Sequence, residues 1–360
     1  MTKHATTTYG LDLGDKKSVL CVLDASGEVV EEARVATTRH GFTRYFENRA
    51  PAQIIMEVGV HSPWVSRHLE GLGHEVLVAN ARRVKLISEN HRKGDQVDAE
   101  LLARLGRADP KLLSPICHRG EETQTHMAMI RSRAAMVRAR TSLIVSARNT
   151  SKSLGLKIPS CSSDSFYRRA LEALPMGLRE SLLPLLESIK RLSLEIRACD
   201  KRVQKLCETR YPETASLMQV NGVGVITALT FVLLLEDPRR FRNGRAVGAY
   251  LGLVPRRRQS GNKDPQLGIS KVGDGYMRAL LVQCGQYILG PFGQDSALKC
   301  KGLRIVEGGG KGAKKRAIVA VARTLACVLY RLWVTGERYR PFPEGKPEDL
   351  ENLENLEEAV

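Results

Sequence analysis

The chain of 360 residues is long enough for two or three domains, and its 56 Lys and Arg against 39 Asp and Glu give a formal net charge of +17. This excess favours DNA or RNA as a partner, because each phosphate that a cation neutralises releases counterions. The eight cysteines have no CxxC spacing, which argues against a zinc site or disulfide framework and is typical of a cytoplasmic protein. No signal peptide opens the chain, and the longest apolar run, 226–235, is too short for a membrane span.

The N-terminal third combines short strands with helices. Three strands separated by polar turns come first, and a helix, a strand, a helix, a strand and a final helix follow. The predicted strands are 7–13, 18–23, 28–33, 53–58 and 75–79, and the predicted helices are 41–48, 63–72 and 95–105. This order is that of an α/β RNase H-like (RuvC-like) domain, which we assign to residues 1–118. A Rossmann fold does not fit, because no glycine fingerprint follows the first strand.

This order of strands and helices could bring four carboxylates together at one site. Asp12 and Glu57 each end an apolar strand, and Asp95 and Asp98 are spaced so that a helix presents both on one face. Any one of these acids alone is more often a solvated residue, a turn former or a helix cap. Four that converge would repel one another unless divalent cations neutralised them. The pattern therefore predicts a Mg²⁺ site, which Mn²⁺ could also fill, for phosphodiester chemistry.

Residues 119–210 form a predicted helical insertion. Two stretches rich in Arg and Lys, 122–153 and 181–208, are separated by a polar segment. Apolar residues recur at three- and four-residue spacing, most clearly in the second stretch. The pattern predicts an antiparallel helical hairpin or coiled coil that acts as a spacer or dimerisation arm. Two core helices of an ordinary bundle fit the pattern equally well.

Residues 211–338 form a predicted, mainly α-helical domain. Gly222 and Gly224 precede the apolar run and resemble a helix-hairpin-helix turn, in which backbone amides approach a phosphate; a plain tight turn is the commoner explanation. A glycine-rich loop at 308–312 then opens a helix without the spacing of an ATP-binding loop. Residues 339–360 are an acidic tail that we expect to lack a fixed structure. The helix at 313–335 adds basic side chains for nucleic-acid contact, namely Lys314, Lys315 and Arg316.

A serine in the block 252–261 is the candidate nucleophile. Ser260 would need a base, a metal or a cationic cradle to attack phosphorus, and basic residues lie on both sides of it. Taken alone, the segment is more typical of a basic loop with a polar turn. Ser270 competes for the role, although it precedes Lys271 as a helix cap would. The predicted cradle consists of Arg256, Arg257, Arg258, Lys263 and Lys271.

The chain resembles the DEDD-type transposases of bacterial insertion sequences, the group that includes Piv-like invertases and bridge-RNA-guided recombinases. The likeness covers nearly the whole chain. It rests on GLDLG around Asp12, the strand ending at Glu57, KGDQVDA around Asp95 and Asp98, VNGVGVITA, GLVPRRRQSG with ISKVG, and the basic C-terminal helix. One departure is Gly94, where the family more often has Thr or Asn.

The resemblance implies an activity and its partners. The four acids match the metal-binding tetrad of the family, and Ser260 matches the serine that is thought to attack DNA and form a phosphoserine link. The resemblance also implies cleavage and rejoining of DNA at the element ends and at the target, guided by a structured noncoding RNA. A homo-oligomer (dimer or tetramer) and a place near the nucleoid in the bacterial cytoplasm are expected on the same basis.

Two other interpretations stay open from the residues alone. A RuvC-like, metal-dependent, structure-specific DNA endonuclease would use the same acids with water as nucleophile, and would need no serine. A noncatalytic nucleic-acid-binding protein would carry the acids incidentally. Neither the target sequence nor the choice between Ser260 and Ser270 follows from the sequence.

Overall fold

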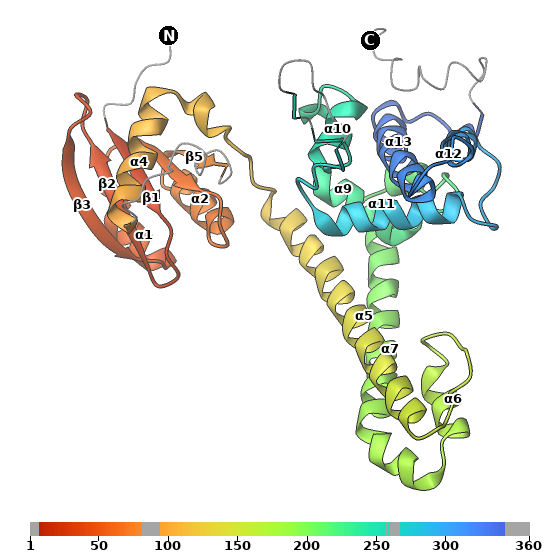
Figure 1. Ribbon diagram of the computed structural model, residues 1–360. Coiled ribbons are helices and arrows are strands. Elements are labelled where there is room, and N and C mark those ends of the chain that lie inside the picture. Colours follow the sequence, from red (N-terminus) through yellow and green to blue (C-terminus); the bar gives the residue numbers. More distant parts are fainter. Residues whose placement is uncertain (1–6, 81–93, 257, 260–266, 343–360) are drawn as a thin grey trace. The chain divides into compact units, whose positions relative to one another are not determined.

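The computed structural model describes residues 7–80, 94–256, 258–259 and 267–342. The chain divides into two compact units, Met1–Gly120 and Glu121–Val360, drawn in red to orange and in yellow to blue in Figure 1. The first predicted boundary, at residue 118, lies close to this division. The boundary predicted at residue 210 has no counterpart among the two units, because helices before and after it share one core. Most of the predicted acidic tail lies outside the described residues.

The N-terminal unit is built on a mixed five-stranded sheet with the order β3-β2-β1-β4-β5. β2 runs antiparallel to both β1 and β3, whereas β4 runs parallel to both β1 and β5. These elements lie within a few residues of the predicted ones. The strands are β1 (Thr8–Asp12), β2 (Lys17–Leu23), β3 (Val29–Ala36), β4 (Gln53–Glu57) and β5 (Glu75–Ala79); the helices are α1 (Arg39–Phe46), α2 (Ser62–Gly71), α4 (Asp95–Ala108) and the short η1 (Pro110–Leu113).

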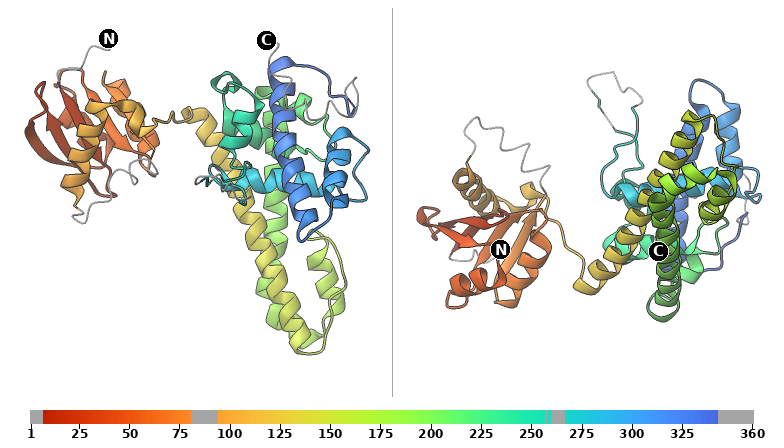
Figure 2. Two further views of the ribbon diagram at one scale, coloured as in Figure 1. Left: turned by 45° about the horizontal axis from the view of Figure 1, so that its top comes forward. Right: turned by 90° about the horizontal axis from the view of Figure 1, so that it is seen from below.

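The two faces of this sheet carry different helices. α1 and α2 cover one face and α4 crosses the other, as the two views of Figure 2 show. Alternation along the strands sends Leu11 of β1 and Met56 of β4 into the core with Phe42 of α1. On the opposite face, Ala99 and Ala103 of α4 pack against β2. The polar ends of β1 and β4 therefore have a helix over them on one side.

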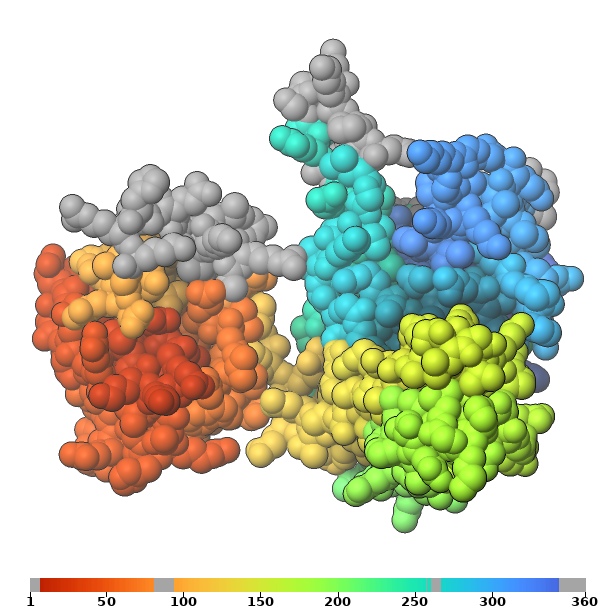
Figure 3. All heavy atoms as spheres, turned by 60° about the horizontal axis from the view of Figure 1, so that its bottom comes forward, coloured from red at the N-terminus to blue at the C-terminus, as the bar shows by residue number. Residues whose placement is uncertain are grey.

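The second unit begins with a long helical hairpin. α5 (Glu121–Ser153) and α7 (Met176–Arg210) run antiparallel, and α6 (Phe166–Ala173) packs at their far end, where Figure 3 shows a continuous yellow-green surface. α7 starts before the predicted residue 181 and continues through Pro184. Phe166, Ala147 and Leu186 share a small core at that end. The predicted hairpin is thus present, and its other end belongs to the main core of the unit.

That main core unites the hairpin with the C-terminal helices. Ile130 of α5 and Val203 of α7 are fully buried in one cluster with Leu325 and Leu329 of α13. α13 is the one helix in the described parts of the chain that is long and apolar enough to cross a membrane. It packs instead against α10, α11 and α12. The remaining helices are α8 (Thr214–Leu217), α9 (Val225–Leu235), η2 (Pro238–Arg240), α10 (Gly244–Tyr250), α11 (Gly275–Ile288), α12 (Ala297–Glu307) and α13 (Ala313–Thr335).

Candidate active site

The ends of β1 and β4 bring the first two acids together. Leu11 of β1 pairs in register with Met56 of the parallel neighbour β4, so Asp12 and Glu57 end adjacent strands at the same edge of the sheet. Leu11 and Met56 point toward α1 and α2. Because side chains alternate along a strand, Asp12 and Glu57 point to the other face, which α4 covers.

α4 lies exceptionally close to β1, and a glycine permits this. A Cβ built on Gly10 would stand 1.8 Å from the carbonyl oxygen of Ala99 and 2.7 Å from the nitrogen of Ala103. Any larger residue would push the helix away. Asp95 and Asp98 occupy the first turn of α4, directly before this contact. The close packing thus sets the height of the two helical acids above the strand ends.

Two arginines fasten the other end of α4. Arg107 donates from Nη1 to the carbonyl oxygen of Asp24 at 3.1 Å and from Nη2 to that of Ala25, and Arg104 donates to Gly27 at 3.1 Å. All three carbonyls belong to the turn between β2 and β3. Bonds between a charged donor and backbone carbonyls are stronger than neutral ones. They fix the helix along its axis and so contribute to the position of its acidic first turn.

Burial and neighbouring negative charges raise the pKa values of the two strand acids. Burial, and after it the negative charges of Asp95, Asp98 and Glu57, raise the pKa of Asp12 to about 6. Burial and the charge of Asp98 also raise the pKa of Glu57. Asp95 and Asp98 themselves are exposed to solvent. The structure therefore brings the predicted carboxylates close enough that the helical acids disfavour ionisation of the strand acids: Asp98 acts on both Asp12 and Glu57, and Asp95 acts on Asp12.

The donor chemistry of this centre fits a divalent cation. All four groups are carboxylates, and hard cations such as Mg²⁺ prefer oxygen ligands. Within the described residues, no three His, Cys, Asp or Glu side chains stand close enough to form a ready metal-binding group. The acids thus interact at electrostatic range rather than at coordination distance. The ion pairs found among the described residues of this unit use other acids, namely Glu31, Asp15 and Glu100.

The loop after β4 holds a contact that sequence reasoning missed. The ring nitrogen Nδ1 of His61 accepts a hydrogen bond from Trp64 Nε1 at 3.1 Å. An indole nitrogen can only donate, so the imidazole proton resides on Nε2, which faces Asp15 Oδ1 at 3.3 Å. This contact joins the loops that follow Glu57 and Asp12. The available signal was only a histidine shortly after the strand acid.

The serine-bearing block forms the arms of a short hairpin. Pro255 bridges Ile269 in antiparallel fashion, and Arg256 N–H donates to the carbonyl oxygen of Gly268 at 3.0 Å. Two left-handed glycines allow its base to close, since a Cβ on Gly252 would lie 2.2 Å from the oxygen of Val272. Gly273 has the same constraint, with the carbonyl oxygen of Tyr250 at 2.1 Å.

The predicted nucleophile and cradle are only partly described. Ser260, Arg257 and Lys263 lie outside the described residues. Arg256, Arg258 and Lys271 are exposed, and Lys271 has a left-handed backbone with φ of 56°. The Oγ of the competing Ser270 is buried and has no hydrogen-bond partner among the described residues.

The two glycines of the predicted helix-hairpin-helix turn have different surroundings. Gly222 has φ of +94°, and a Cβ there would lie 2.8 Å from the ring of Tyr287, so it is needed for packing. Gly224 precedes α9 with open space beside its Cα and no side-chain cap on the helix. Only Gly224 thus leaves its backbone open to a ligand. The preceding α8 is a single turn.

The basic residues at the start of α13 differ in their contacts. Lys314 and Lys315 are exposed and point away from the core. Arg316 instead donates to the carbonyl oxygens of Lys311 at 2.8 Å and Gly309 at 2.9 Å. The two lysines are therefore the better candidates for phosphate contacts, and Arg316 holds the glycine-rich loop.

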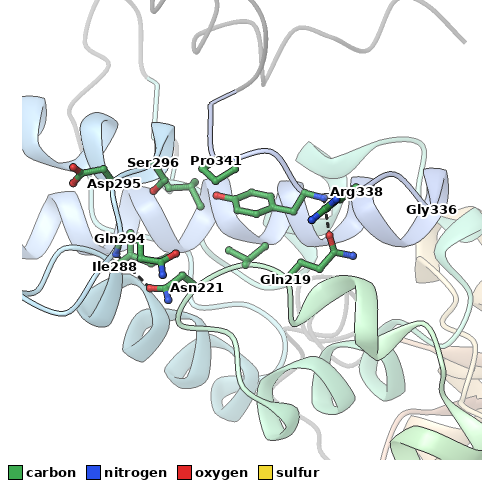
Figure 4. A pocket seen from close by; sticks show the side chains of 12 residues that line it. Gln219, Asn221, Ile288, Gln294, Asp295, Ser296, Gly336, Arg338 and Pro341 are labelled. Atoms are coloured by element: carbon green, nitrogen blue, oxygen red, sulfur yellow. Dashed lines mark hydrogen bonds between the residues drawn. The ribbon is translucent and has the colours of Figure 1, made fainter.

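A cavity of about 630 Å³ lies elsewhere in the second unit. It lies between the turn at Gln219 and Asn221, the segment that joins α11 to α12, and the stretch that follows α13, as Figure 4 shows. No motif in the sequence indicated it, because its walls come from three distant segments.

Two family models of transposases match this chain. A model described as transposase of the IS116/IS110/IS902 family matches residues 214–296, and a DEDD transposase model of the IS110 type matches residues 9–153.

Curated relatives extend this likeness over most of the chain. The transposase for insertion sequence element IS1111A of Coxiella burnetii is 27% identical over 92% of this chain and 90% of its own length. A probable family 20 transposase of Pseudomonas aeruginosa is 30% identical, over 76% of this chain and 81% of its own. The transposase for element IS1328 of Yersinia enterocolitica is 28% identical, over 78% and 83%. The chain therefore belongs to the IS110 family of DEDD transposases.

Proposed function

We propose that this protein is a DNA transposase and site-specific recombinase that cleaves and rejoins strands at the ends of its element and at the target. The observation that carries the proposal is the position of Asp12 and Glu57 at the ends of neighbouring strands, where the negative charge of Asp98 acts on both and that of Asp95 acts on Asp12. A bound cation would relieve the repulsion within this concentration of negative charge, which stands in a chain of net charge +17. The strand order supports an RNase H-like (RuvC-like) fold for this unit.

The four carboxylates would hold Mg²⁺, or Mn²⁺ in its place. A bound cation would supply activation of an attacking oxygen and stabilisation of a leaving oxygen at phosphorus. Asp12 and Glu57 contribute donors fixed by the sheet, and the first turn of α4 contributes exposed donors that can adjust to the ion. Because the pKa of Asp12 is raised, a cation and a proton would compete for this carboxylate, and cation binding would release the proton.

Ser260 is the proposed nucleophile of the second unit. A bond forms between its Oγ and the scissile phosphorus while the bond from phosphorus to a deoxyribose oxygen breaks; the serine proton leaves to a base and the departing oxygen gains a proton. The exposed Arg256, Arg258 and Lys271 would stabilise the phosphate charge, together with Arg257 and Lys263. The family resemblance is the support for this step, for a structured guide RNA, for a dimer or tetramer, and for a cytoplasmic location near the nucleoid.

A metal-dependent endonuclease that uses water is the second candidate. One observation favours it: all four acids belong to the first compact unit, so hydrolysis would need no residue from the second. Cleaved product without a protein–DNA adduct would identify this activity.

The deciding experiment compares Asp12→Asn and Ser260→Ala on labelled element-end DNA. We expect both to abolish strand transfer, and only Asp12→Asn to leave a serine that could still be trapped on DNA. Glu75→Gln is the matched control, since Glu75 is exposed at the opposite edge of the sheet, at the start of β5. Retained cleavage by Ser260→Ala without strand transfer or a protein–DNA adduct would favour the endonuclease. Strand transfer by Ser260→Ala would exclude Ser260 as the nucleophile, and cleavage by Asp12→Asn would exclude a catalytic role for the acids.

A further inference from the structure

The cavity of the second unit is closed by a short segment that we call the C-terminal strap, residues 336–341. The backbone N–H of Tyr339 donates to Gln219 Oε1 at 2.9 Å, and the carbonyl oxygen of Pro341 accepts from Ala297 N–H at 2.8 Å. The strap is thereby attached both to the turn before α9 and to the start of α12. These bonds make the cavity a built site with defined walls.

Two side-chain amides in the wall have a fixed orientation. Gln219 uses its oxygen to accept from Tyr339 N–H, and Asn221 uses Oδ1 to accept from the backbone N–H of Gln294 at 3.4 Å. A backbone N–H can only donate, so in both amides the oxygen is assigned and the NH₂ group is left for another partner. In Figure 4 both amides come from the turn that borders the cavity. The wall thus offers hydrogen-bond donors at two positions.

The rest of the lining mixes apolar, aromatic and polar side chains and is close to neutral in charge. Ile288 and Leu298 are buried side chains of the wall, and Tyr339 also lines the cavity. The charged lining residues are one arginine, Arg338, and one aspartate, Asp295, so their charges cancel. A free phosphate finds little net attraction here. A flat, neutral group with carbonyl acceptors meets a ring, an apolar floor and two donors.

We propose that this cavity takes one unstacked nucleobase of a bound strand, with preference for bases that carry a carbonyl oxygen (thymine, uracil, guanine or cytosine) over adenine, which has none. The volume of about 630 Å³ lies in the range of small-molecule sites. An aromatic ring with amide donors is a combination by which proteins hold bases of single strands. The proposal rests on the proposed function only in that the protein handles nucleic acid, and strand exchange necessarily exposes unpaired bases.

The test uses two variants that keep each amide oxygen and remove only the donor. Gln219→Glu and Asn221→Asp retain the acceptor for the backbone N–H, so the strap and turn stay attached. Gln283→Glu is the matched control, because Gln283 is exposed on α11 and does not line the cavity. The probes are a single-stranded thymidine oligonucleotide and an abasic oligonucleotide of equal length, followed by fluorescence anisotropy with the full-length protein.

We expect each pocket variant to weaken binding of the thymidine strand by about tenfold, while its binding of the abasic strand and all binding by Gln283→Glu stay unchanged. Photocrosslinking with 5-iodouracil in the same strand should attach to the peptide that contains Tyr339. Equal losses on both strands would mean that added negative charge alone acts, and would overturn the proposal. Unchanged affinity together with crosslinks elsewhere would overturn it as well.

The outcome is independent of the catalytic proposal. Strand cleavage by Asp12→Asn tests the acidic centre in the first unit, whereas the oligonucleotide binding tests the second unit. If the pocket variants lose base selectivity while the unaltered protein cleaves DNA normally, both the cavity proposal and the catalytic proposal are supported, each by its own measurement. If Asp12→Asn still cleaves but the thymidine strand is bound selectively, the cavity proposal stands alone.

Discussion

The two sites differ in what holds their side chains. In the first unit, the acids are carried by adjacent strands and by a helix that contacts the sheet at backbone distance through Gly10. In the second unit, the basic hairpin is supported by turns, whose closure depends on Gly252 and Gly273. The comparison teaches that repelling carboxylates need a rigid frame, whereas cations that contact phosphates need only an accessible position.

The largest expected effect on activity comes from neutralising one of the four acids of the first unit. Asp98→Asn should lower strand cleavage by about a thousandfold, because a ligand of the cation is lost, while DNA binding persists. Arg258→Gln, in the glycine-supported hairpin, should mainly weaken binding. Cleavage under single turnover at saturating protein separates the two effects. Equal behaviour of both variants would erase the difference between the sites.

The next effect concerns the contact between α4 and β1. Gly10→Ala would place a methyl group 1.8 Å from the oxygen of Ala99 and should destabilise the first unit by about 3 kcal/mol. Gly71→Ala is the control, since nothing lies within 4 Å of its Cβ position. Urea unfolding can be followed by Trp64 in a Trp333→Phe background, because each unit has one of the two tryptophans. An unchanged urea midpoint for Gly10→Ala would mean that the close contact at Gly10 does not fix the distance between α4 and β1.

A smaller effect is expected from pH. Burial lowers the pKa of His74, which packs edge-on against Phe46 in the first unit. The unfolded chain protonates this histidine near pH 6.5, and the folded chain only at lower pH. The contribution of His74 to the stability of the first unit should therefore shrink as the pH falls below about 6.5, whereas the raised pKa of Asp12 acts in the opposite direction. His74→Phe should reduce that loss in the Trp64 signal; an identical pH profile would assign the sensitivity to another group.

The smallest effect belongs to the start of α13. Replacing Lys314 and Lys315 with Gln should weaken duplex binding several-fold and make the salt dependence shallower by about 2 in logarithmic slope, since each phosphate contact contributes about 0.9. Arg316→Gln should leave the slope intact and loosen the glycine-rich loop, because Arg316 binds backbone carbonyls. Titrations at several salt concentrations measure both. A slope that responds to Arg316 rather than to the lysines would reverse their roles.

The sequence predicted the first unit well because its signals are local. Apolar alternation marked the strands, and a polar residue at the end of β1 and β4 pointed to one edge of a sheet. The spacing of Asp95 and Asp98 then predicted their shared helical turn, which the structure contains. The closeness of α4 to β1 could not be predicted, because Gly10 reads equally as a strand or a turn residue until its partner is known.

The second unit was harder to predict from the sequence, because its core is formed by segments that lie far apart in the chain. α13 was predicted with its observed ends, yet α6, α10, α11 and α12 were not recognised. Their apolar residues face a core formed by distant segments, so short windows gave no clear period. The helix-hairpin-helix prediction assigned both glycines to phosphate contact, and it did not indicate that a Cβ at Gly222 would meet the ring of Tyr287. The cavity beside it depends on three segments and left no trace in any one of them.

The C-terminal strap has a practical consequence for shortened forms of the protein. A chain ended at Thr335 would keep the complete last helix, together with the buried residues of the main core. It would lack the amide that orients Gln219 and the carbonyl that engages Ala297, leaving one wall of the cavity missing. Such a truncated protein could pass every assay of folding while its strand preference had already changed.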